Sequence, residues 1–108
     1  MSVLDELRDE TRSFAGARDW FQFHTPKNLA MAIAGEAGEL AAEFQWLTTE
    51  ESSPDAIAGE RSVAIRLEMA DVFIYLLRLS DVLKVDLANA VREKLSINEA
   101  RFPKREEV

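Results

Sequence analysis

Residues 28–47 have the sequence NLAMAIAGEAGELAAEFQWL, and residues 66–83 have the sequence RLEMADVFIYLLRLSDVL. Apolar residues dominate both stretches at the three- and four-residue spacing of an α-helix. Each stretch also carries two acids three residues apart, in the motifs GEAGE and LEMAD, and this spacing places both acids on one side of a helix. The two stretches therefore predict two core helices that carry four carboxylates.

The four acids of these motifs are Glu36, Glu39, Glu68 and Asp71. At about 100° per residue, Glu36 and Glu68 each fall within the apolar arc of their helix, and the second acid of each motif lies about 60° to the same side. E-x-x-E is common on solvated helix faces, but a solvated acid is expected opposite the apolar arc. A carboxylate in the core needs a compensating group, which could be a metal ion or a basic side chain such as Arg66 or Arg78.

Two such faces packed together would place four carboxylates around one point. Hard oxygen ligands of this kind suit Mg2+ or Mn2+. Gly35 and Gly38 cost about 1 kcal/mol each relative to alanine in a helix, and they would permit the close helix packing that brings the second pair within reach. The pattern predicts a metal site built from helices, with Mg2+ as the ion and Mn2+ as the alternative.

Composition limits the class of protein. With 108 residues, 47% of them hydrophobic, the chain is expected to form one domain, 1–108. The net charge of -7 argues against a nucleic-acid partner. The absence of cysteine excludes disulfides and zinc–thiolate sites, and the single histidine excludes a histidine-rich zinc site within one subunit. No signal-like or membrane-length apolar run is present, which predicts no membrane association and a cytoplasmic location.

Helix signals divide the chain into four parts, and no strand-like alternation competes with them. Ser2, Thr25 followed by Pro26, and Asp86 are the expected N-terminal caps. The expected helices cover residues 3–20, 26–47, 60–83 and 87–102, with a polar loop over 48–60. The predicted fold class is all-α, a bundle of four to five helices.

Basic and aromatic residues form a second group of candidates. Lys94, Asn98 and Arg101 recur at helical spacing near the end of the fourth helix. They either clamp a phosphate or mark where the helix leaves the core. The aromatic candidates Trp20, Trp46 and Tyr75 are core residues by default, but indoles near helix ends can line a pocket and stack on a base.

His24 and Lys27 lie on either side of the expected start of the second helix. His24 is either an ordinary loop histidine or, together with Lys27, part of an anion site, because a helix N-terminus attracts negative charge.

The motifs resemble a known family. E-x-x-E followed on the next helix by E-x-x-D is typical of the MazG-like superfamily of all-α nucleoside triphosphate pyrophosphohydrolases. The stretches ARDWFQFHTPKNL, GEAGELAAEFQWL, DVFIYLL and VDLANAVREKLSINEARFP are similar to its dCTP pyrophosphatase branch. The resemblance extends over residues 17–103.

This resemblance implies hydrolysis of a (deoxy)nucleoside triphosphate between the α and β phosphates. Glu36, Glu39, Glu68 and Asp71 would bind Mg2+, with Glu39 orienting or deprotonating the attacking water. Lys94, Asn98 and Arg101 would bind phosphate, with help from His24 and Lys27, and Trp20, Trp46 and Tyr75 would line the base and sugar pocket. Family members form dimers or tetramers with sites near subunit interfaces, so a homo-oligomer, a homotetramer among the options, is expected.

The expected substrate is dCTP or a modified pyrimidine triphosphate, and the expected role is the cleaning of nucleotide pools. One departure bears on the base: Thr11 stands where relatives carry a histidine, which leaves dUTP or a broad substrate range as alternatives. A noncatalytic helical oligomer that binds a nucleotide or a protein is the alternative from another class.

Overall fold

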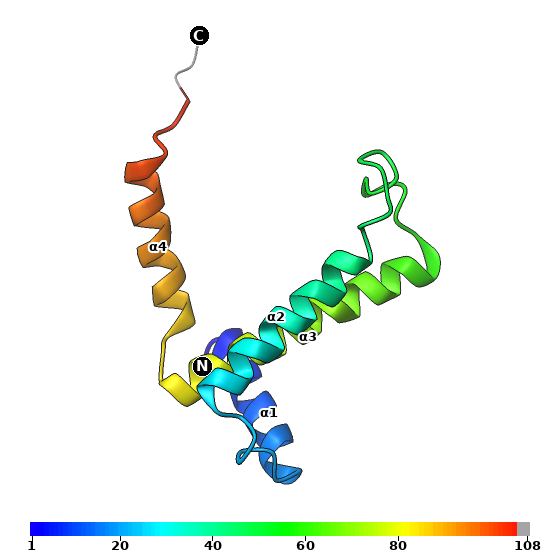
Figure 1. Cartoon of the computed structure of the whole chain (residues 1–108). Helices are drawn as coiled ribbons and strands as arrows, with labels where there is room; N and C mark the ends of the chain where they lie inside the picture. Colours follow the sequence, from blue (N-terminus) through cyan, green and yellow to red (C-terminus); the bar gives the residue numbers. More distant parts are fainter. Residues whose placement is uncertain (106–108) are drawn as a thin grey trace.

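The computed structural model describes residues 1–105 and contains four helices and no strand in that part of the chain (Figure 1). The helices are α1 (Val3–Ala17), α2 (Pro26–Ala42), α3 (Gly59–Leu83) and α4 (Leu87–Arg101). The predicted all-α class is confirmed. The last three residues of the predicted domain, 106–108, lie outside the described residues.

Local capping chemistry explains where three of the helices begin. The Ser2 hydroxyl accepts a hydrogen bond from the Asp5 N–H at 3.1 Å, and the Thr25 hydroxyl accepts one from the Asn28 N–H at 3.2 Å. The Asp86 carboxylate does the same for the Asn89 N–H at 3.1 Å. Each bond satisfies one of the backbone donors that a helix start leaves free. All three predicted caps are confirmed.

The predicted end of the second helix is wrong, because α2 ends at Ala42 rather than near residue 47. The Glu43 and Phe44 N–H groups bond to carbonyls three residues back, those of Leu40 and Ala41, and such bonds tighten and end a helix. No proline or glycine marks this point in the sequence. Trp46 therefore lies in the turn that follows α2.

The first helix also ends earlier than expected, at Ala17 rather than near residue 20. The Arg18 N–H bonds to the Ala15 carbonyl, and Asp19 takes a left-handed conformation with φ of 58°. The chain turns there, and Trp20 belongs to the connection between α1 and α2.

Packing of α2 against α3 forms the centre of the molecule. The two helices run side by side over much of their length, and α1 crosses α3 near its C-terminal half (Figure 1). Leu29 of α2 and Leu77 of α3 are the largest fully buried side chains of residues 1–105, at 1% and 2% exposure. Beyond α2, the Arg61 guanidinium donates to the Glu43 carbonyl at 2.5 Å and closes the base of the long loop.

The fourth helix does not join this packing within residues 1–105, and Figure 1 shows it extending away from the α2–α3 pair. The molecule measures 53 × 39 × 27 Å with a radius of gyration of 17.2 Å, whereas a compact domain of this length has one of about 13 Å. Val91 and Leu95 of α4 are 55% and 61% exposed. A single chain therefore forms only part of the predicted bundle.

None of the helices described combines the length and the low polarity needed to cross a membrane.

We expect Leu29→Ala and Leu77→Ala each to lower the free energy of unfolding by about 2–5 kcal/mol, since each truncation leaves a cavity in the small core. Val3→Ala is the matched control, because Val3 is 69% exposed, and its effect should stay within about 0.5 kcal/mol. Urea titrations of the three variants at one protein concentration measure these changes. Equal losses in all three would contradict a core centred on the α2–α3 contact.

Candidate active site

Three of the four predicted acids come together between α2 and α3. Glu36, Glu39 and Glu68 each offer a carboxylate oxygen, and these oxygens lie within 4.8 Å of one another. Glu36 and Glu68 are half-buried, whereas Glu39 is exposed. Asp71, one turn beyond Glu68 on α3, is close enough to act electrostatically on both half-buried acids. The packing of α2 on α3 thus produces the clustering that the two motifs predict.

The cluster disfavours its own negative charge. Burial raises the pKa of the Glu36 carboxyl, and the charges of Glu39 and Asp71 raise it further. The pKa of Glu68 is raised by the same causes in the same order. Desolvation and like charges both favour the neutral form of an acid. A cation at this point would favour the charged carboxylates and so oppose both effects.

No basic side chain of residues 1–105 forms an ion pair with these acids. Oε2 of Glu36 and Oε2 of Glu68 are buried without a hydrogen-bond partner among the described residues. Arg78, considered above as a compensating group, is bonded elsewhere, to His24 and Asp81. Unpartnered buried carboxylate oxygens are costly, and hard oxygen donors are what Mg2+ and Mn2+ prefer. The residues therefore fit a divalent cation.

The glycines beside Glu36 and Glu39 do not serve the close packing expected of them. A Cβ added at Gly35 or Gly38 would meet nothing within 4 Å. The α2–α3 contact therefore does not depend on small residues at these positions, and the backbone next to the acids is open within the chain.

An aromatic cavity of about 290 Å³ lies between α1, α3 and the turn that follows α1. Trp20, His24 and Tyr75, three of the predicted substrate-binding residues, line it together. The His24 ring centre lies 6.1 Å from that of Trp20 and 6.4 Å from that of Tyr75. The rings are inclined to one another, by 54° between Trp20 and His24 and by 70° between His24 and Tyr75, as is common for packed aromatic side chains. The structure thus places His24 among the aromatic residues.

The acid cluster and the aromatic cavity are connected through α3. Asp71 and Tyr75 are four residues apart on this helix, so their side chains lie on one face about one turn apart. A ligand with a charged end and a flat end could lie along this face.

The other predicted substrate-binding residues lie apart from this cavity. Trp46 is 87% exposed in the turn after α2, and Lys27 is exposed in the first turn of α2. Lys94, Asn98 and Arg101 follow α4 away from the α2–α3 pair. Residues 1–105 of a single chain do not unite all the predicted site residues.

Five lining residues were not predicted from the sequence: Glu10, Phe14, Ala15, Ile74 and Arg78. Arg78 had a detectable signal, because it is a basic residue inside an otherwise apolar run and lies three residues after Tyr75. Thr11, singled out above as a departure from the family pattern, also lines the cavity. The departure therefore occurs at the wall of the pocket itself.

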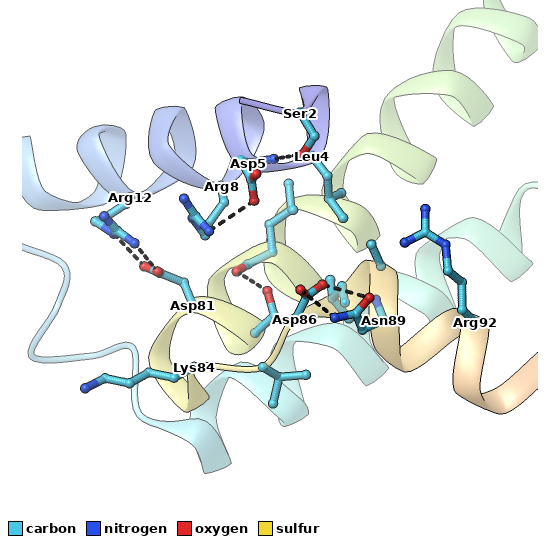
Figure 2. Close-up of a pocket in the computed structure, with 15 residues that line it drawn as sticks. Ser2, Leu4, Asp5, Arg8, Arg12, Asp81, Lys84, Asp86, Asn89 and Arg92 are labelled. Carbon is cyan, nitrogen blue, oxygen red and sulfur yellow. Dashed lines mark hydrogen bonds and ion pairs between the residues drawn. The ribbon is translucent and has the colours of Figure 1, made fainter.

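A larger cavity of about 490 Å³ lies where α1, the end of α3 and the start of α4 meet (Figure 2). Its lining contains none of the predicted site residues. Figure 2 shows that its three acids each accept a hydrogen bond from a side chain, Asp5 from Arg8, Asp81 from Arg12, and Asp86 from Asn89. These pairings leave this cavity without the unsatisfied carboxylates that distinguish the cluster on α2 and α3.

Comparison with known proteins agrees with the geometry, although no protein-family model matches the chain. The chain is 44% identical over 101 residues to dCTP pyrophosphatase 1 of Homo sapiens and 43% identical over 101 residues to that of Bos taurus. These alignments cover 94% of this chain but 59% and 60% of the relatives. The chain thus spans about three fifths of their length.

A solved structure matches the chain over nearly its whole length. The crystal structure of a pyrophosphatase from Archaeoglobus fulgidus superposes with a TM-score of 0.87 at 38% identity, covering 96% of this chain and 95% of that one. The four helices, the paired acidic motifs and these similarities agree. The chain belongs to the MazG-like all-α nucleoside triphosphate pyrophosphohydrolases, and over the aligned residues it is similar to the dCTP pyrophosphatases.

Proposed function

We propose that this protein hydrolyses a (deoxy)nucleoside triphosphate to the monophosphate and pyrophosphate in a Mg2+-dependent reaction. The observation that carries this proposal is the acid cluster, in which carboxylate oxygens of three residues lie within 4.8 Å and two buried oxygens have no partner among residues 1–105. Glu36, Glu39, Glu68 and Asp71 would hold the ion. Bound Mg2+ supplies positive charge that screens the phosphates and positions the attacking water.

Glu39 is the acid best placed to handle the water, because it is the exposed member of the cluster. It accepts the proton of the water while the water oxygen bonds to the α phosphorus and the bond to the β-phosphate oxygen breaks. Pyrophosphate leaves with the electrons of that bond. The half-buried Glu36 and Glu68 act as fixed ligands.

The aromatic cavity supports a pyrimidine substrate, dCTP or a modified pyrimidine triphosphate. Its volume of about 290 Å³ is at the small end of ligand pockets, and Trp20 and Tyr75 provide flat faces for a base. The relatives named dCTP pyrophosphatase 1 support the same choice. Because Thr11 lines this cavity, dUTP or a broad range of triphosphates is the alternative.

We also propose that the protein works as a homo-oligomer, a dimer or a tetramer. In one chain, α4 carries exposed Val91 and Leu95 and extends away from α2 and α3. Apolar surface of this kind is covered in a stable assembly. Lys94, Asn98 and Arg101 would then reach the phosphates bound at the acids of another copy.

We expect Glu68→Gln to lower Mg2+-dependent pyrophosphate release more than about 100-fold, because one ligand loses its charge. Glu60→Gln is the matched control, since Glu60 is an exposed acid on the same helix. Monophosphate and pyrophosphate are measured for dCTP, dUTP, modified pyrimidine and purine triphosphates, and circular dichroism reports the fold. Wild-type turnover in Glu68→Gln would refute the metal site, and binding of triphosphates without turnover in the wild type would favour a noncatalytic protein.

The raised pKa values predict an unusual pH dependence without metal. Folded Glu36 and Glu68 hold protons that the unfolded chain releases, so the contribution of these acids to stability falls as pH rises from about 4.5 through their raised pKa values. Glu68→Gln removes one charge, and we expect this variant to be more stable than wild type at neutral pH without metal. The difference in stability between Glu68→Gln and wild type should shrink as the pH falls towards 4.5.

Bound Mn2+ should make wild type more stable than Glu68→Gln, because a ligand that binds only the folded state stabilises that state. Denaturation curves with and without Mn2+ should show stabilisation of wild type and Glu60→Gln but little of Glu68→Gln. Equal Mn2+ stabilisation of all three proteins would contradict a cation at the cluster.

Assembly is tested by light scattering and by mixing two inactive variants. Glu68→Gln lacks a metal ligand and Arg101→Ala lacks a phosphate ligand, so each should be inactive alone. If each site draws on two copies, refolding an equal mixture rebuilds intact sites and restores about a quarter of the wild-type turnover in a dimer. A monomer with full turnover, or an oligomeric mixture that stays inactive, would contradict the shared site.

A further inference from the structure

Arg78 is a buried charge that the proposed reaction does not use. This residue of α3 is only 3% exposed. Burying a guanidinium is costly unless its donors are satisfied. Nε donates to Nδ1 of His24 at 3.1 Å, and Nη1 donates to Oδ2 of Asp81 at 2.8 Å. The ring centre of Phe21 lies 5.2 Å from the guanidinium carbon.

Asp81 connects this arginine to α1. Its carboxylate also accepts from Arg12, through Nε at 2.9 Å and through a second bond from Nη2 (Figure 2). One carboxylate thus holds two guanidiniums, and the hydrogen bond from Arg12 is the main cause that lowers the pKa of Asp81. The result is a continuous chain from Arg12 through Asp81 and Arg78 to His24, and it joins α1, α3 and the turn before α2.

The hydrogen bond between Nε of Arg78 and Nδ1 of His24 determines the tautomer of His24. A guanidinium has only donors, so Nδ1 of His24 must accept. A neutral imidazole that accepts at Nδ1 carries its proton on Nε2. Burial lowers the pKa of His24, and the charge of Arg78 lowers it further, so both favour the neutral ring.

We propose that Arg78 is a positioning residue that, with Asp81 and Arg12, fixes His24 as the Nε2–H tautomer, so that the aromatic cavity offers an N–H donor to an acceptor on the edge of the base. Because His24 lines this cavity with Trp20 and Tyr75, the donor lies beside the stacking faces. The acceptor class is a ring nitrogen or carbonyl oxygen of a pyrimidine. The base part of this inference rests on the proposed nucleotide substrate, whereas the tautomer does not.

His24 is the single histidine of the chain, so its imidazole 15N signals need no assignment. In the wild type at neutral pH we expect a proton on Nε2 and none on Nδ1. Arg78→Met should give a mixture of tautomers and a higher His24 pKa, because both the hydrogen bond and the nearby positive charge are lost. Arg66→Met, an exposed arginine on the same helix, should leave the spectrum unchanged. A wild-type proton on Nδ1, or an unchanged spectrum in Arg78→Met, would overturn the proposal.

Kinetics test the role in base recognition. Arg78→Met should raise KM for pyrimidine triphosphates about tenfold with little change in kcat, the effect of one lost hydrogen bond in binding. Arg78→Lys keeps the positive charge but lacks the planar guanidinium that bonds to His24 and Asp81 together. We expect its KM to lie between those of wild type and Arg78→Met. An unchanged KM in a folded Arg78→Met would overturn the role in base recognition.

The two proposals can fail separately. A wild-type protein that hydrolyses no triphosphate refutes the proposed function, and the 15N spectrum of that same protein still decides the tautomer. If Arg78→Met does not fold, the wild-type spectrum still decides the tautomer of His24, and the KM of Arg78→Lys decides the role in base recognition.

Discussion

Repulsion among carboxylates on the α2–α3 pair is the constraint on which the rest of the structure depends. The contact that buries Leu29 and Leu77 also brings acids of both helices within 4.8 Å of one another. Burial and like charge raise the pKa values of Glu36 and Glu68, and no basic side chain of residues 1–105 pairs with them. The helix pair therefore carries a charge imbalance that folding alone does not remove. A divalent cation would remove it, and the same contact would then serve both the fold and the proposed reaction.

The fourth helix shows a comparable incompleteness in its packing. Apolar side chains stay exposed on all four helices, among them Phe14 of α1, Met31 of α2, Leu67 of α3 and Leu95 of α4. Burial in a chain of this length is limited by its surface-to-volume ratio. A second copy would supply the missing contacts. The same copy would also bring basic residues to an acidic cluster that forms no ion pair within residues 1–105.

Local chemistry made much of this fold predictable, and long-range contacts account for what was not. The caps at Ser2, Thr25 and Asp86 depend on residues three positions away, so the sequence alone reveals them. The end of α2 at Ala42 lacks a proline or glycine signal. Periodicity identified the acids of the cluster, because position within an apolar arc is a property of one helix. The bond of Arg78 to His24 joins residues 54 positions apart, and no helical spacing encodes it.

Two buried charge systems lie on α3, and their difference in hydrogen bonding separates two kinds of role. Glu68 has a buried oxygen without a partner among the described residues, so it is available to a ligand. Arg78 is bonded to two side chains, so in the proposed role it would act on a ligand through His24. Ten residues of continuous helix separate them, about 15 Å at the rise of an α-helix. The continuous α3 helix therefore sets the separation between the acid cluster and the aromatic cavity, and substitutions that leave this helix intact can change one without moving the other.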